Sequence, residues 1–129
     1  MPKTWIAATA FLLAAAANAH DLSVSSIVVR AGASQTLVSV RVHRPNLTPE
    51  NPQEQILTRL KLSFDGSPPR WQNVELVEDP VSDTFLWQAI HPAQVDKVTL
   101  HAPLFPELLP ERTIINLLRN GAQAGNAVL

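Results

Sequence analysis

The sequence has 129 residues, of which 46% are hydrophobic and 16% charged, with a formal net charge of -1 and no cysteine. A chain of this length supports one domain, and its apolar fraction is too high for a disordered protein. The absence of cysteine excludes disulfides, thiolate zinc sites and cysteine nucleophiles. The near-neutral charge gives no electrostatic basis for binding nucleic acid, so we expect no nucleic-acid partner.

Residues 1–19 have the three-part layout of a cleavable signal peptide. Lys3 is followed by an apolar run from Trp5 to Ala17, which is shorter than the roughly 20 residues of a membrane-spanning helix. We expect cleavage after Ala19, which makes His20 the first residue of a periplasmic protein; an uncleaved N-terminal anchor is the alternative. Residues 20–129 then form the extracytoplasmic domain, with nine basic residues against 11 acidic ones.

From Leu22 onward, apolar residues recur at every second position, which is typical of half-buried β-strands. Turn residues separate these segments about every ten residues, as in a sandwich or barrel rather than in βαβ units. The predicted strands are Leu22–Arg30, Thr36–His43, Arg59–Phe64, Trp71–Val77, Thr84–Ile90, Lys97–His101 and Arg112–Leu118.

Turns and prolines complete the predicted fold. Asn120-Gly121 is a type I′ hairpin signal, which pairs Arg112–Leu118 with a last strand toward Leu129. Only Pro52–Leu60 has a helical pattern, and the 11 prolines argue against long helices. We therefore predict an all-β fold, a single antiparallel β-sandwich of immunoglobulin-like type with at most one short helix.

The alternating patterns also predict the core of this sandwich. Among the aromatic residues, Phe85 and Trp87 share one strand face with Ala89, which favours core packing over a ligand-stacking surface. The proline-broken segment Ala102–Pro110 cannot join a central strand, and we expect it to cover an end of the sandwich rather than to form an apolar contact patch. The predicted core residues are Val38, Val40, Val42, Leu60, Leu62, Phe64, Leu76, Phe85, Trp87, Val98, Leu100, Ile115 and Leu117.

His20 is the strongest candidate for a metal ligand, because signal cleavage gives it a free α-amine beside its imidazole. These two groups can chelate copper, and a second histidine brought near by the fold would complete the site. His43 and His101, each at the end of a predicted strand, are the preferred partners, and His91 is also present. Solvated surface histidines are the alternative interpretation. The carboxylates and serines form no catalytic pattern, so we expect no enzyme activity.

The C-terminal part carries a family resemblance. The segment Pro103–Glu107 reads PLFPE, Arg112-Thr113 follows, and Asn120-Gly121 forms the next turn. With the predicted start at His20 and the β-rich body, this order resembles the exported N-terminal region of HupE/UreJ-type membrane proteins. The resemblance implies an outer domain that precedes a membrane module, with accessory roles toward hydrogenase or urease and, for some members, nickel or cobalt uptake. The transport residues of that family belong to membrane helices and match no position here.

These observations predict a non-catalytic extracytoplasmic binding or interaction domain of the HupE/UreJ type, whose partner is a membrane module. The alternative is a soluble periplasmic copper-binding protein that uses His20. No motif specifies copper, nickel or cobalt as a cofactor. The sequence stops on Val128-Leu129 within the last predicted strand, so we expect either a natural protein that continues or a truncated reading frame; a strand that simply ends there remains the alternative.

Overall fold

The computed structural model describes residues 24–108 and 110–129, so the predicted signal peptide at residues 1–19 lies outside the described residues. The elements are β1 (Val24–Ala31), β2 (Thr36–His43), the 3₁₀ turn η1 (Arg44–Asn46), α2 (Pro52–Arg59), β3 (Leu62–Phe64), β4 (Gln72–Asp79), β5 (Thr84–His91), β6 (Val98–Leu100), β7 (Arg112–Arg119) and β8 (Ala122–Val128).

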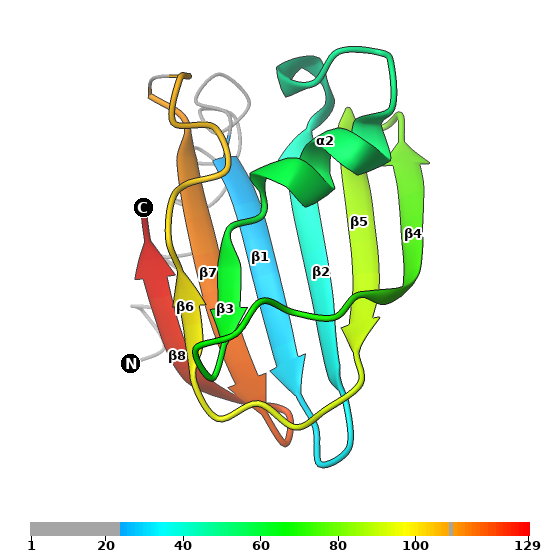
Figure 1. The fold of residues 1–129 in the computed structure, drawn as a ribbon. Helices are drawn as coiled ribbons and strands as arrows, with labels where there is room; N and C mark the ends of the chain where they lie inside the picture. The colour runs from blue at the N-terminus through cyan, green and yellow to red at the C-terminus, as the bar shows by residue number, and fades with distance from the viewer. Residues whose placement is uncertain (1–23, 109) are drawn as a thin grey trace, which may run out of the picture.

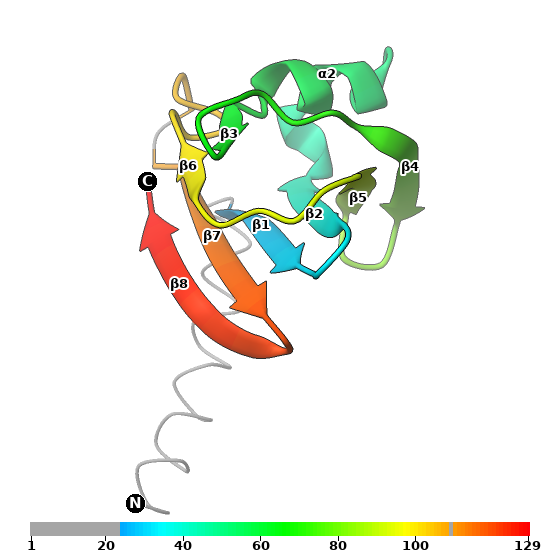
Figure 2. The ribbon, with the colours of Figure 1, turned by 60° about the horizontal axis from the view of Figure 1, so that its bottom comes forward.

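The strands form two layers. Six of them make one sheet in the order β4-β5-β2-β1-β7-β8, and β3 pairs with β6 in a second, smaller sheet. Figure 2 shows the large sheet curving beneath a second layer of α2, β3 and β6. In the view of Figure 1, α2 lies over the upper ends of β2 and β5, and the β3–β6 pair lies over β7 and β1. The predicted fold class, an all-β sandwich with at most one short helix, is confirmed.

One strand pair departs from the predicted antiparallel pattern. β1 and β7 run parallel, with Val24 beside Arg112 and Ala31 beside Arg119, while the other pairs are antiparallel. Parallel strands need a crossover connection. The chain makes it by leaving the large sheet after β5, forming β6 in the second layer, and returning to the large sheet as β7.

The core lies between the two layers, on the inner face of the large sheet. Every residue predicted for the core is either buried or packed against it at partial exposure. The sequence prediction missed Ile27 and Val29 on β1, Ile56 on α2, and Val95, Leu104 and Phe105 in the loops, all of which are buried. Leu104 and Phe105 confirm that the segment from Ala102 to Pro110 covers the sandwich, although Leu109 lies outside the described residues.

A two-residue turn closes the β7–β8 hairpin, and a similar turn follows β3, where Phe64 bridges to Ser67. Asn120 and Gly121 have φ values of 51° and 78°, the left-handed conformation at both positions that a type I′ turn requires. They join β7 to β8 in the predicted hairpin, with Arg119 opposite Ala122. Asp65 and Gly66 have the same left-handed backbone, at φ 51° and 82°.

The strand predicted at Arg59–Phe64 is wrong in its first part. α2 continues through Arg59, and only Leu62–Phe64 is extended as β3. Tertiary contacts hold the last helical turn, because the Arg59 guanidinium donates to the Leu104 carbonyl at 3.0 Å and to Glu107 at 2.6 Å. The alternating pattern nevertheless marks burial correctly, since Leu60, Leu62 and Phe64 are all in the core.

Trp87→Ala is expected to lower the free energy of unfolding by about 3–5 kcal/mol, because the indole is completely buried between the layers and its removal leaves a large cavity. Val77→Ala on the neighbouring strand β4, where Val77 is 50% exposed, should change it by less than about 0.5 kcal/mol. Urea unfolding followed by circular dichroism measures both. Equal losses in the two variants would contradict this assignment of the core.

Candidate functional site

A groove opens at one end of the sandwich, between the connection from β2 to α2 and the β4–β5 hairpin. β2 ends at His43, and the chain turns immediately through η1, where Pro45 favours the first turn. The groove has a volume of about 680 Å³. Its lining residues are Arg44, Pro45, Leu47, Thr48, Pro49, Pro52, Leu76, Glu78, Asp83 and Phe85.

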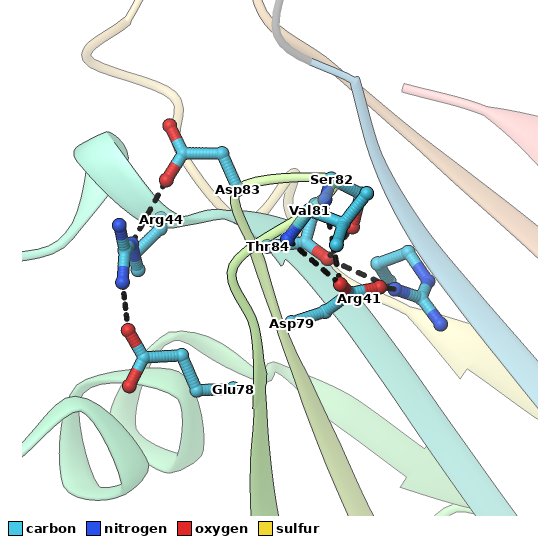
Figure 3. Close-up of polar contacts among 8 residues, drawn as sticks. All are labelled: Arg41, Arg44, Glu78, Asp79, Val81, Ser82, Asp83 and Thr84. Carbon is cyan, nitrogen blue, oxygen red and sulfur yellow. Dashed lines mark hydrogen bonds and ion pairs between the residues drawn. The ribbon is translucent and has the colours of Figure 1, made fainter.

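Arg44 is fixed in this groove by the β4–β5 hairpin (Figure 3). Its Nε donates to Asp83 Oδ1 at 2.8 Å, its guanidinium forms an ion pair with Glu78, and its backbone N–H donates to the Asp83 carbonyl at 2.8 Å. Asp83 has a left-handed backbone at φ 57°, so the hairpin turn directs both its carbonyl and its carboxylate to Arg44. Two carboxylates against one guanidinium leave this cluster with a net charge of about -1.

The same hairpin carries a second polar cluster, which Figure 3 shows beside the first. Asp79 Oδ1 accepts hydrogen bonds from the backbone N–H groups of Val81 at 3.1 Å and Ser82 at 3.4 Å. The hydrogen bond from the Ser82 hydroxyl is the main cause that holds the Asp79 pKa below its ordinary value. Arg41 donates to Thr84 Oγ1 at 2.9 Å. These contacts fix the turn that forms one wall of the groove.

The floor of the groove is apolar. Leu47 is buried, while Leu76 and Phe85 are partly exposed at the edge of the core. Pro45, Pro49 and Pro52 add rigid apolar surface. A concave apolar surface with a few fixed polar groups is the usual form of a ligand site. This arrangement can receive apolar side chains on its floor and a cationic group at its rim.

A buried carboxyl group lies at the entry to β7. Glu111 is 7% exposed, and its Oε2 accepts a hydrogen bond from the hydroxyl of Ser25, which is fully buried on β1. For the buried Glu111 Oε1, no hydrogen-bond partner lies among residues 24–108 and 110–129. The pKa of Glu111 is raised to about 7, mainly by burial and to a smaller extent by nearby Glu107, against the opposing effects of the Ser25 hydroxyl and Arg59.

The structure describes two of the three histidines named as metal candidates, His43 and His101. His20 lies outside the described residues. His43 ends β2 at the same end of the sheet where β1 begins, and it alternates with buried Val42, so it faces away from the core. His101 follows β6 in the second layer, within 2.6 Å of Ser63 Oγ. His43 and His101 therefore lie in different layers. Within the described part of the chain, no group of three or more His, Asp or Glu side chains is arranged to hold a metal.

His91, the remaining histidine, has a structural role. It is buried, and its Nδ1 accepts a hydrogen bond from the Arg70 N–H at 3.0 Å. Its ring packs edge-on against Phe64 with the centroids 4.9 Å apart. Burial lowers its pKa, which favours the neutral ring that this hydrogen bond requires.

The sequence prediction missed both the groove and the Glu111 pair. Turn residues from Asp79 to Asp83 indicate a hairpin, but local chemistry does not show which other loop that hairpin faces. Glu111 meets Ser25 across 86 positions of the chain, through the parallel pairing of β1 with β7. No local pattern predicts such a contact.

Neither a comparison with models of known protein families nor a comparison with curated proteins finds a match for this chain. Within residues 24–108 and 110–129, no helix combines the length and the apolar character needed to cross a membrane.

Glu111→Gln is expected to remove a pH-dependent loss of stability. Burial raises the folded-state pKa of Glu111 from 4.5 to about 7, so the folded protein holds this proton more tightly than the unfolded chain does. The stabilisation is complete below about pH 4.5 and is lost as the pH rises through about 7, a change of at most about 3 kcal/mol. Urea unfolding of wild type and variant at about pH 5 and about pH 8 measures it.

Glu75→Gln is the matched control, because Glu75 is exposed on β4, at the far edge of the large sheet from Glu111. This variant should keep the wild-type change between the two pH values. His91 titrates in the same interval with the opposite sign, since its folded-state pKa is lowered and stability from it grows as the pH rises. The deciding quantity is therefore the difference between wild type and variant, and a Glu111→Gln protein with unchanged pH dependence would refute the assignment.

Proposed function

We propose that this chain is a non-catalytic extracytoplasmic binding domain of the HupE/UreJ type, and that the groove beside Arg44 receives a segment of a membrane module. The signal-peptide pattern at residues 1–19 and the resemblance around Pro103–Glu107 support the location and the family. Nickel or cobalt handling would then belong to the membrane module.

The observation that carries the proposal is the construction of the groove. Its walls come from η1, the start of α2 and the β4–β5 hairpin, and the contacts of Arg44 hold two of these walls together. Binding that needs little rearrangement loses less free energy to ordering. A groove fixed in this way suits recognition of an extended segment from another protein.

The negative charge at the rim of the groove limits which segments can bind there. Glu78 and Asp83 share the single guanidinium of Arg44, and their side chains are 50% and 36% exposed. The rim therefore favours a basic group, while Leu76 and Phe85 favour aliphatic side chains on the floor. The proposed ligand is an extracytoplasmic segment in which aliphatic residues stand beside a lysine or arginine.

Random dodecapeptides displayed on phage and selected on the exported domain test this function. We expect the selected peptides to combine aliphatic residues with Lys or Arg. Glu78→Lys should weaken their binding at least about tenfold, because it reverses the charge of the rim. The measurement is the dissociation constant of each selected peptide, obtained by fluorescence polarisation.

Glu75→Lys is the control for this experiment. Glu75 lies on the same strand as Glu78, pairs with Gln88 and does not line the groove. Its replacement by lysine changes the charge by the same amount outside the groove. Its effect on binding should stay within about twofold. Two results overturn the proposal: no peptide is enriched on the wild-type domain, or Glu75→Lys weakens binding as much as Glu78→Lys does.

A second candidate function is copper binding by the mature N-terminus, and the strand register favours it. β1 begins at Val24, and its pairing with β2 begins at Ser26 opposite Arg41; the same register continued outward would place Val24 opposite His43. His20 stands four residues before Val24, and four residues span at most about 14 Å. His20 can therefore reach the end of β2 that carries His43, and His43 is the better partner than His101.

Titration with one equivalent of Cu²⁺ tests the copper site on exported protein whose mass shows that it begins at His20. We expect His20→Ala to lower the affinity at least about a hundredfold, because it removes the imidazole half of the chelate, and His43→Ala to lower it about tenfold. His101→Ala is the control and should leave the affinity unchanged. If His20→Ala binds copper as tightly as wild type, the N-terminal site does not exist.

A further inference from the structure

One side of the sandwich is open, along β6 and β8. Among residues 24–108 and 110–129, β8 is the outermost strand of the large sheet on this side, and β6 pairs only with β3 (Figure 1). Between them lies a second groove of about 260 Å³, which no charged residue lines. Val98 and Leu100 of β6 form one wall, and Gly125 and Ala127 of β8 form the other.

The backbone of β8 presents hydrogen-bonding groups to this open side. Thr113 and Leu129 exchange two backbone hydrogen bonds, at 2.9 and 2.8 Å. In an antiparallel pair such positions alternate, so Ala127 and Gly125 also bond to β7. The N–H and C=O groups of Asn126 and Val128 then point away from β7, where the sheet order places no further strand among the described residues.

The two edges of the large sheet differ in their protection against pairing. On the opposite edge, β4 carries Glu75, Glu78 and Asp79, and its register is interrupted between Gln72 and Glu75. Charges and bulges are the usual means of blocking an edge strand. β8 has the sequence AQAGNAV, without a charge or a proline. The last four residues of β8, Gly125–Val128, follow the shift in register opposite Leu117/Leu118 of β7. They form an edge that can accept another strand.

On one face of this edge, the protruding side chain of Leu129 lies near an open space at Gly125. A Cβ built at Gly125 would meet no atom within 4 Å, so the space above this residue is open. Four positions later, Leu129 lines the same groove and is 41% exposed. An antiparallel partner with the same sequence, related by a twofold axis at Ala127, would place its leucine over the open space at Gly125.

We propose that two copies of this chain associate through β8, paired antiparallel about a twofold axis at Ala127. In this register, Asn126 of each copy pairs with Val128 of the other and uses the four outward backbone groups. Leu129 of one copy covers Gly125 of the other, and this happens twice because the interface is isologous. The side chains of β8 carry no charge that would repel its own copy.

This inference is independent of the proposed groove function. The Arg44 groove lies over β4 and β5, at the opposite edge of the large sheet. A dimer formed through β8 leaves both Arg44 grooves accessible, so the domain would present two binding sites. Either proposal can therefore fail without the other.

Sedimentation velocity of the exported protein, from micromolar to millimolar concentration, tests the dimer. Wild type should change from monomer to dimer over this range. Val128→Pro should weaken association at least about tenfold, because it removes an outward N–H that β7 does not use. Leu129→Lys, a change at an exposed side chain, should weaken it by a similar factor.

The register has its own test. Gly125→Glu should weaken association, and combining it with Leu129→Lys should restore it to within about threefold of wild type, since each new carboxylate then faces the ammonium of the other copy. Val77→Lys on the β4 edge is the control and should change nothing. A wild-type protein that stays monomeric, a dimer that ignores Val128→Pro and Leu129→Lys, or a double variant that fails to recover overturns the proposal.

Discussion

The structure depends on packing between two layers of unequal size. Six strands present one wide apolar face, whereas the regular elements of the second layer, within the described part of the chain, are two three-residue strands and an eight-residue helix. Aromatic rings fill the space between them. Trp71 meets Trp87 edge-on with centroids 5.1 Å apart, and Phe64 meets Trp71 at 6.0 Å. Because Trp71 precedes β4, this contact also fastens the segment that returns from the second layer to the large sheet.

This packing tolerates two buried polar atoms for which no hydrogen-bond partner lies in the described part of the chain, Trp87 Nε1 and Glu111 Oε1. An unpaired buried polar group costs about 1–3 kcal/mol. Burying an indole or a similar large side chain returns a comparable or greater amount. For Glu111 the cost appears instead as a raised pKa, since the protonated carboxyl is easier to bury than the carboxylate.

The sequence alone predicted the features that local chemistry decides. The alternation of Val38, Val40 and Val42 gave a buried face, and Asn120-Gly121 gave the type I′ turn that the positive φ angles confirm. Features that depend on contacts between distant segments were missed: the parallel β1–β7 pair, the contact of Glu111 with Ser25, and the Arg44 groove. The His20 copper hypothesis and the family resemblance remain predictions.

Both grooves form because the second layer does not fully cover β4 and β8, the two outermost strands of the large sheet. Leu76 on β4 and Gly125 on β8 face the inner side of the sheet, but the second layer covers the central strands and leaves these positions partly open. Polar contacts of Arg44 fix the walls of one groove, whereas the small residue Gly125 leaves the other unfilled. Because the second layer covers both positions incompletely, they are available for contacts with other molecules. The same imbalance that makes the aromatic packing necessary thus creates the two surfaces on which binding is proposed.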